Sequence, residues 1–175
     1  MPTNHKSIEQ SPYAAYATAT GWVCMRLSYA DLAAGDLLMT LLEITNEKAG
    51  HALHGRIELT RKIKIIKDVA TVRHHSDDWL GRVKTAVNEL DELSQIRHRY
   101  AHDIWAVSTN GEVVKEQYKV ELEQARRGYP PEVQTIAKTH VLISQMHALA
   151  DKIDAIAEII RALRDEYLAH LLRRP

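Results

Sequence analysis

Phenylalanine is absent from this chain of 175 residues. The chain also contains only one cysteine, five prolines and seven glycines. A single cysteine, Cys24, excludes an internal disulfide and any zinc site built from several cysteines. Helix-breaking residues are therefore rare, and Ala, Leu, Ile, Glu, Lys and Arg are abundant, which favours helices. These absences together predict an all-α protein whose thiol stays reduced.

Neither sign of charge is in excess, because 23 Lys and Arg balance 23 Asp and Glu. Proteins that bind nucleic acid nonspecifically are usually basic, so the balance argues against broad duplex binding. It still allows a small pocket that engages one or two phosphates. The longest apolar clusters, such as LLMTLLEI, are far shorter than the roughly 20 residues of a membrane span, and no apolar signal-peptide core is visible. We therefore expect a cytoplasmic protein with no membrane partner.

Four long segments carry apolar residues at helical spacing. The pattern predicts helices over about 13–48, 56–72, 77–103 and 131–172. Residues 1–11 are polar, and we expect them to be loose. The expected fold is an all-α, up-and-down bundle of four to five helices that forms a single domain over residues 1–175.

An insertion over residues 104–130 separates the third long helix from the last. Within it, Asn110-Gly111 lies between two β-prone runs, which is a strong signal for a hairpin. We expect a short β-hairpin or a long loop here. A turn at RRGYPP, residues 126–131, follows it, and one of its prolines is expected to open the last helix.

The last helix carries a long apolar seam. Its members alternate spacings of three and four residues over three heptads, as in a coiled coil. They are Met146, Leu149, Ile153, Ile156, Ile160, Leu163 and Tyr167. The seam suggests a homodimer, but an intramolecular bundle needs the same seam, so both uses stay open.

Two further groups of polar residues have a simple interpretation as solvated surface. The second helix carries a run of cations, which a solvated face explains and for which a surface for RNA or an acidic partner is the alternative. They are Arg61, Lys62, Lys64 and Lys67. The pairs His51 and His54, and His74 and His75, are interpreted as surface histidines rather than as a metal cluster.

The segment RHRYAHDIW, residues 97–105, concentrates the residues that can perform chemistry. Arg97, His98 and His102 lie within two helical turns. They supply a fixed cation and bases that titrate near neutral pH, which is what phosphodiester chemistry without a metal ion needs. His98 and His102 lack the Glu of a HExxH arrangement, so we expect no metal site.

A helical wheel separates the members of this segment. Arg97 points to the centre of the apolar stripe of its helix, where an arginine needs an acidic or phosphate partner. His102 lies about 140° away from Arg97, so the two do not meet on one straight helix face. A distorted helix end, the long Arg stem or a second copy of the segment would bring them together. The carboxylates of the first helix that qualify as partners of Arg97 are Asp31, Asp36 and Glu43.

Arg97, His98 and His102, followed by Asp103 and Trp105, resemble the Arg-x4–6-His motif of the HEPN superfamily. Many bacterial members read close to RNxxAHxxW on the third helix of a four- or five-helix bundle. Here His98 stands where Asn is commoner, and Asp103 stands where Gly is frequent. The resemblance implies a metal-independent endoribonuclease or an RNA-binding relative, in which the two motifs of a homodimer line one cleft.

The resemblance also implies roles for the individual residues. His102 takes the proton of an RNA 2′-OH, which attacks the adjacent phosphorus and leaves a 2′,3′-cyclic phosphate. Arg97 stabilises the phosphoryl oxygens, and His98 orients His102 or the phosphate. DNA lacks the 2′-OH and is not cut by this route. No cofactor is expected, and the substrate-binding residues are Arg99, Tyr100, Asp103 and Trp105.

Three functions follow from these observations. The leading one is a ribonuclease of toxin or defence type, paired with a neutralising antitoxin-like protein. A second is a noncatalytic helical module that binds a nucleotide or a protein. The third is a structural dimer in which a carboxylate of the first helix neutralises Arg97 and Trp105 is a packing anchor.

Overall fold

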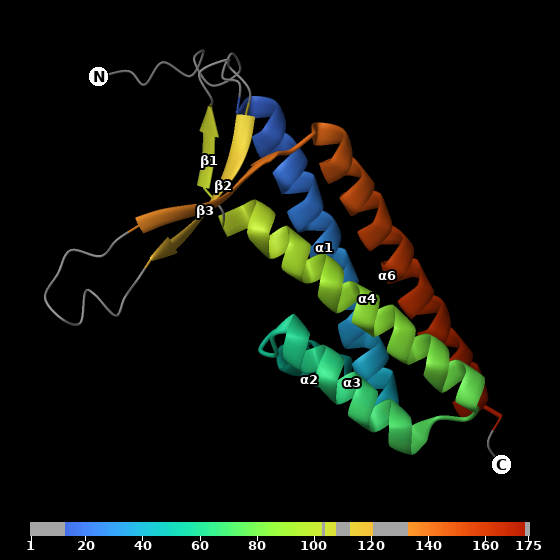
Figure 1. Ribbon diagram of the computed structural model, residues 1–175. Coiled ribbons are helices and arrows are strands. Elements are labelled where there is room, and N and C mark those ends of the chain that lie inside the picture. The colour runs from blue at the N-terminus through green and yellow to red at the C-terminus, as the bar shows by residue number, and fades with distance from the viewer. Residues whose placement is uncertain (1–12, 103, 108–112, 121–132, 174–175) are drawn as a thin grey trace, which may run out of the picture.

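The computed structural model describes residues 13–102, 104–107, 113–120 and 133–173. Within these residues the chain forms a helical bundle with a small antiparallel sheet at one end (Figure 1). The helices are α1 (Ala14–Leu41), α2 (Glu47–His54), α3 (Leu59–Arg73), α4 (Asp77–His102) and α6 (Ile143–Leu171), and the strands are β1 (Ile104–Val107), β2 (Val113–Val120) and β3 (Val133–His140). The bundle confirms the predicted fold class.

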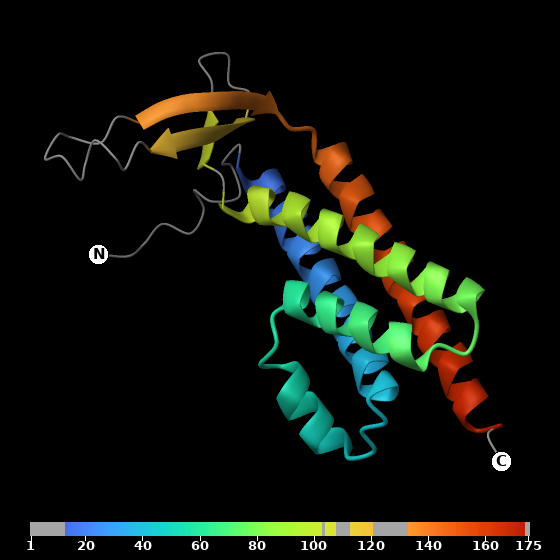
Figure 2. The same cartoon turned by 60° about the horizontal axis from the view of Figure 1, so that its bottom comes forward.

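The first and last helices lie side by side and run in the same direction, away from the sheet (Figures 1 and 2). Two ion pairs fix their register. Arg26 Nη1 lies 2.9 Å from Asp154 Oδ2, and Arg164 Nη1 lies 3.5 Å from Asp36 Oδ2. Both pairs join residues at the same separation along the chain, as parallel helices require. The up-and-down alternation is therefore not strict.

The apolar seam of α6 is used inside the chain. All of its predicted members are buried, and α6 packs against α1 and α4. On the facing side, α1 contributes small buried residues that let the two helices approach closely. They are Ala19, Ala30, Ala33 and Ala34. The seam thus serves the intramolecular bundle and is not available as the surface of a homodimer.

Helix α2 is held on α1 by a close contact. A Cβ added to Gly35 would lie 1.4 Å from His54 Cδ2, so only glycine leaves room for the His54 ring. Behind it Lys62 is 1% exposed, with its Nζ 2.6 Å from Asp31 Oδ1 and 3.4 Å from His54 Nε2. The prediction of a fully solvated cation face on α3 was therefore wrong, because Lys62 is buried. His54 is half-buried against α1 rather than a fully exposed surface histidine.

Helix α4 begins where the sequence predicts. The backbone N–H of Trp79 donates to Ser76 Oγ at 3.2 Å, and the acidic Asp77 and Asp78 occupy the first turn. The buried Trp79 indole donates to the carbonyl of Leu163 at 3.0 Å and ties α4 to α6.

Two predicted helices are shorter than expected. The first ends at Leu41, because Glu43 takes a φ of 54°, and Asn46 then caps α2 by accepting from the N–H of Ala49 at 3.0 Å. The last helix begins at Ile143 rather than near residue 131. The residues before it form β3, whose β-branched Val, Thr and Ile favour a strand and which pairs with β2.

The insertion holds more β structure than expected. Strand β1 pairs with β2 as in the predicted hairpin, with Val107 opposite Val113, and β3 adds a third antiparallel strand. The Asn110-Gly111 turn, the RRGYPP turn and residues 1–11 lie outside the described residues. Among the helices that the structure describes, none is both long and apolar enough to cross a lipid bilayer.

Candidate functional site

The RHRYAHDIW segment spans the junction between the bundle and the sheet (Figures 1 and 2). Arg97, His98, Arg99 and Tyr100 occupy the last turns of α4, and His102 is its last residue. The side chain of His102 and the whole of Asp103 lie outside the described part of the structure. The predicted pairing of Arg97 with His102 through a second copy therefore stays a prediction.

Arg97 is half-buried, and its Nε is buried without a hydrogen-bond partner. None of the carboxylates predicted to neutralise it does so, because each one pairs with another cation. Asp31 pairs with Lys62, Asp36 with Arg164 and Glu43 with Arg73. A buried donor without an acceptor costs about 1–3 kcal/mol, which a purely structural residue has no reason to retain. The structural-dimer interpretation thus loses its proposed partner for Arg97.

A hollow of about 470 Å³ lies between the start of α1, the end of α4 and β1. Its walls are mainly aromatic, with a hydroxyl, a thiol and small residues between the rings. The side chains that shape it are Tyr13, Tyr16, Thr20, Cys24, Tyr100 and Trp105. Of the predicted substrate-binding residues, Tyr100 and Trp105 thus line the same space, whereas Arg99 is exposed and is not part of its wall.

Trp105 organises this hollow. Its indole N–H donates to the backbone carbonyl of Tyr100 at 3.0 Å, which fixes the ring against the end of α4. The ring centroids of Trp105 and Tyr16 lie 5.7 Å apart, and those of Trp105 and Tyr100 lie 6.3 Å apart. Trp105 is therefore a packing anchor, as predicted, and at the same time a wall of the hollow. Burial raises the pKa of Tyr100, so its phenol stays neutral at physiological pH.

Arg97 and the hollow share one face of α4. Tyr100 and Ala101, which both line the hollow, follow Arg97 by three and four residues, so they lie one helical turn further along the same side. An arginine whose Nε lacks a hydrogen-bond partner in the part of the chain that the structure describes thus adjoins an aromatic cavity. That combination suits a ligand with a flat ring and an adjacent phosphate. The ring stacks on aromatic faces, and the guanidinium donates hydrogen bonds to the phosphate oxygens.

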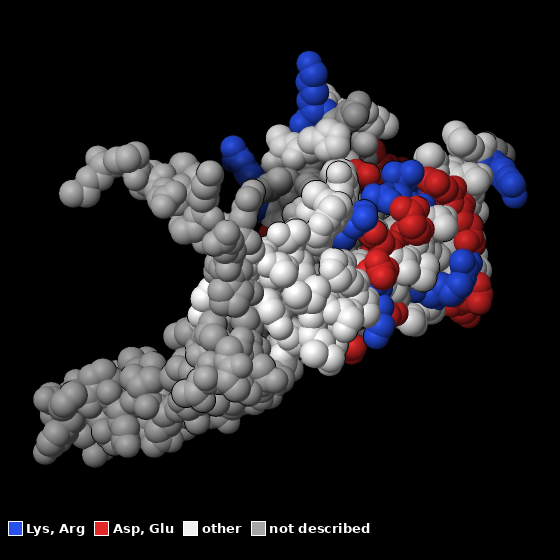
Figure 3. Space-filling view, turned by 90° about the horizontal axis from the view of Figure 1, so that it is seen from above, with Lys and Arg blue, Asp and Glu red and all other residues white. Residues whose placement is uncertain are grey.

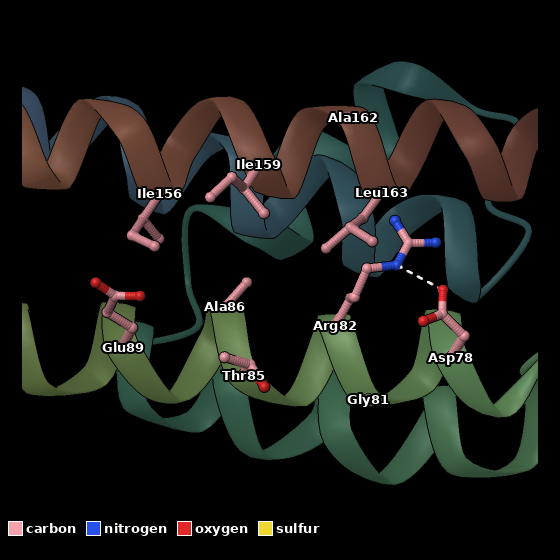
Figure 4. A pocket seen from close by; sticks show the side chains of 10 residues that line it. All are labelled: Asp78, Gly81, Arg82, Thr85, Ala86, Glu89, Ile156, Ile159, Ala162 and Leu163. Carbon is pink, nitrogen blue, oxygen red and sulfur yellow. Dashed lines mark hydrogen bonds and ion pairs between the residues drawn. The ribbon is translucent and has the colours of Figure 1, made fainter.

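A second hollow, of about 640 Å³, lies between α4 and α6 (Figure 4). Its cation, Arg82, donates from Nε to Asp78 Oδ2 at 2.9 Å and from Nη2 to Glu166 Oε1 at 2.8 Å. The hydrogen bond to Glu166 is the main cause that raises the pKa of Arg82. Ile156, Ile159 and Leu163 make the α6 side apolar. Because its arginine is already neutralised, this hollow is a poorer anion site than the region around Arg97.

The wider surface offers no extended basic area on the face seen in Figure 3. Basic and acidic side chains of the described residues are intermixed there, and a broad area carries neither. No group of three His, Cys, Asp or Glu residues that could hold a metal ion occurs in the part of the chain that the structure describes.

The contribution of α1 to the hollow is not among the features that the sequence predicts. Tyr13, Tyr16, Thr20 and Cys24 recur at spacings of three and four residues, which places them on one side of α1. This spacing is visible in the sequence. Because α1 is apolar on most of its circumference, the spacing does not distinguish this side of the helix from the others. That this side meets Trp105 follows only from the tertiary structure.

Comparison with protein-family models, with curated proteins and with solved structures gave no match to this chain. The family resemblance of residues 97–105 therefore stays a prediction. Function is inferred below from the geometry of the site and from the chemistry that its residues can perform.

Proposed function

We propose that this protein binds single-stranded RNA at the end of α4 and cleaves it without a metal ion, as a ribonuclease of HEPN type. The observation that carries the proposal is the half-buried Arg97, whose buried Nε has no hydrogen-bond partner among the described residues, one helical turn from an aromatic hollow. The residues at positions 97, 98 and 102, which resemble the HEPN motif, support it.

Binding follows from the two parts of the site. A volume of about 470 Å³ accommodates a nucleobase, and it lies within the usual range of about 300–1,000 Å³ for ligand pockets. A base enters only when it is unstacked from its neighbours, which favours single strands over duplexes. With the base in the hollow against Tyr16, Tyr100 and Trp105, an adjacent phosphate is proposed to reach Arg97.

The proposed cleavage uses the RNA's own hydroxyl. His102 removes the proton of the 2′-OH, the 2′ oxygen bonds to the adjacent phosphorus, and the bond from phosphorus to the 5′ oxygen breaks. The departing oxygen takes a proton from water, and the products are a 2′,3′-cyclic phosphate and a 5′-hydroxyl. Arg97 stabilises the charge on the phosphoryl oxygens, while His98, four residues before His102, orients it or the phosphate.

A ribonuclease of this kind needs control in the cell. We propose a toxin or defence role in the cytoplasm, with an antitoxin-like protein that neutralises the site. A second copy of the chain is a further proposed partner, because Arg97 and His102 point about 140° apart on one straight helix and a second copy of the segment would bring them together.

The direct test is incubation of the purified chain with single-stranded RNA in the presence of a chelator. We expect 2′,3′-cyclic ends, no cleavage of DNA or of 2′-O-methyl RNA of the same sequence, and loss of cleavage in Arg97→Ala and His102→Ala. Arg82→Ala is the matched control, because that arginine lies in the other hollow and should leave cleavage unchanged. Activity that persists in His102→Ala would refute the mechanism.

One observation favours a noncatalytic alternative. The hollow is largely apolar and aromatic, so it binds a base whether or not a bond is broken afterwards. Fluorescence anisotropy of dye-labelled 2′-O-methyl RNA measures binding separately from cleavage. Binding that is lost in Trp105→Leu, without any cleavage of unmodified RNA, would establish a binding module in place of the nuclease.

A further inference from the structure

The outer face of α1 carries a row of large apolar side chains that remain exposed. Trp22 is 43% exposed, Met25 40%, Tyr29 47% and Leu32 39%. Their spacings of three, four and three residues place them on one stripe, on the side of α1 opposite the buried residues Val23, Leu27, Ala30 and Ala34. Exposed apolar residues are ordinary when scattered, but a continuous stripe marks an interaction surface.

We call this stripe the α1 outer stripe (Trp22, Met25, Tyr29 and Leu32). One charged side chain lies beside it: the guanidinium carbon of Arg26 is 5.4 Å from the centroid of the Trp22 ring. The charged residues of α1 are Arg26, Asp31 and Asp36, and each is engaged in an ion pair within the chain. The exposed neighbours of the stripe include the small Thr18, Gly21 and Ser28, and a Cβ at Gly21 would meet nothing within 4 Å. Small residues beside large apolar ones let a second helix approach closely, whereas a water-facing surface normally carries charge.

We propose that a second copy of this chain binds to the α1 outer stripe, with the two α1 helices antiparallel about a two-fold axis level with Leu27. The order of spacings reads the same in both directions, so the stripe is complementary to itself under such an axis. Trp22 then lies opposite Leu32 of the second copy, and Met25 opposite Tyr29 of the second copy. Each layer joins an aromatic residue to an aliphatic one.

The packing of these layers selects the antiparallel arrangement. A parallel pair would set Trp22 against Trp22 and Leu32 against Leu32, which overfills one layer and leaves space in another. Antiparallel helices also place the positive end of one helix dipole near the negative end of the other. This proposal rests on the stripe alone and does not depend on the proposed ribonuclease activity.

The size of the stripe sets the expected strength. Side chains of this size that are about 40% exposed leave roughly 80–100 Å² each, so two copies bury on the order of 700 Å² from the stripe itself. That area is below the lower end of the range for stable complexes, which is about 1,200 Å². We therefore expect a weak dimer in reversible exchange with the monomer rather than an obligate one.

Sedimentation of the full chain over a range of concentrations tests the interface. We expect a monomer–dimer equilibrium in the wild type, and a shift to monomer by at least tenfold in the dissociation constant for Met25→Glu and for Tyr29→Glu. Val72→Glu is the matched control, because Val72 is an apolar residue of α3 that is 83% exposed and lies off the stripe. Circular dichroism shows that each variant is folded. A wild type that stays monomeric, or a Tyr29→Glu variant that dimerises normally, would overturn the proposal.

A distance measurement tests the direction of pairing. Spin labels on Thr18→Cys, in a Cys24→Ala background, lie on the outer side of α1, nine residues before the proposed axis. The antiparallel arrangement separates positions 18 of the two copies by about 27 Å along the helix, at about 1.5 Å per residue. A label separation on the order of 30 Å is expected. A separation of about 10–15 Å would show a parallel pair and overturn the antiparallel arrangement.

Discussion

The ring of His54 lies directly on Gly35, and a Cβ at position 35 would come within 1.4 Å of His54 Cδ2 and 2.0 Å of its Nε2. Gly35→Ala therefore forces the ring away from α1 and disturbs its contact with Lys62. We expect the free energy of unfolding to fall by about 1–3 kcal/mol, which urea denaturation measures.

Gly81→Ala is the control for that substitution. Gly81 lies inside α4, and a Cβ there meets nothing within 4 Å. Alanine is the better helix former, so this variant should gain about 0.5–1 kcal/mol. Equal effects of the two substitutions would mean that the contact between His54 and Gly35 contributes nothing.

The buried pair of Lys62 and Asp31 predicts an asymmetry between its two neutralising variants. Asp31→Asn leaves the charge of the buried Lys62 without its counter-ion, so we expect a loss of about 3 kcal/mol in the free energy of unfolding. Lys62→Met replaces the buried charge with an apolar chain of similar length and leaves a partly solvated carboxylate, so its cost should be about 1 kcal/mol or less. Urea denaturation of both variants gives the order, and the reverse order would contradict it.

Replacing Arg97 is expected to preserve stability while it removes function. Arg97→Met removes a buried nitrogen that has no hydrogen-bond partner, so the free energy of unfolding should stay unchanged or rise by about 1 kcal/mol. RNA cleavage and binding should be lost in the same variant. Thermal unfolding and the chelator-resistant cleavage assay are measured on one preparation. A less stable variant with normal cleavage would show that Arg97 is a structural residue.

Tyr100 predicts a pH dependence at the alkaline end. Burial raises the pKa of its phenol, so the folded state holds the proton more tightly than the unfolded state does. Its contribution to stability is complete below the ordinary tyrosine pKa of about 10 and is lost as the pH rises from there through the folded pKa, because the unfolded chain ionises first. Tyr100→Phe should therefore lose less stability than the wild type between about pH 9 and pH 11 in urea denaturation. Identical slopes would contradict the buried position of this ring.

Local signals in the sequence were enough to predict most helices. Ser76 followed by two acids marked the start of α4, and the apolar periodicity of α6 located its buried face. The start of α6 was placed too early, because strand β3 exists through its pairing with β2, and such pairing is not a property of the local sequence.

Only part of the site could be predicted, because the rest depends on tertiary contacts that the local sequence does not encode. The direction of Arg97 toward the bundle followed from the helical wheel, and its half-buried position agrees with that. The ion-pair partners of Asp31, Asp36 and Glu43 could not be predicted. They depend on the parallel register of α1 and α6 and on the packing of α3. The meeting of Tyr16 with Trp105 likewise depended on tertiary contacts between distant segments.

The parallel packing of α1 on α6 has a consequence for synthesis of the chain on the ribosome. The helix that α1 contacts most extensively is also the last of the described helices in chain order. Roughly 100 residues separate the end of α1 from the start of α6, and at about 5–20 residues per second their translation takes on the order of 5–20 s. Throughout that interval the nascent chain presents an α1 segment that is apolar on several sides. The bundle can close only after α6 has been translated, so a chaperone that shields residues 14–41 would protect the unfinished chain from aggregation.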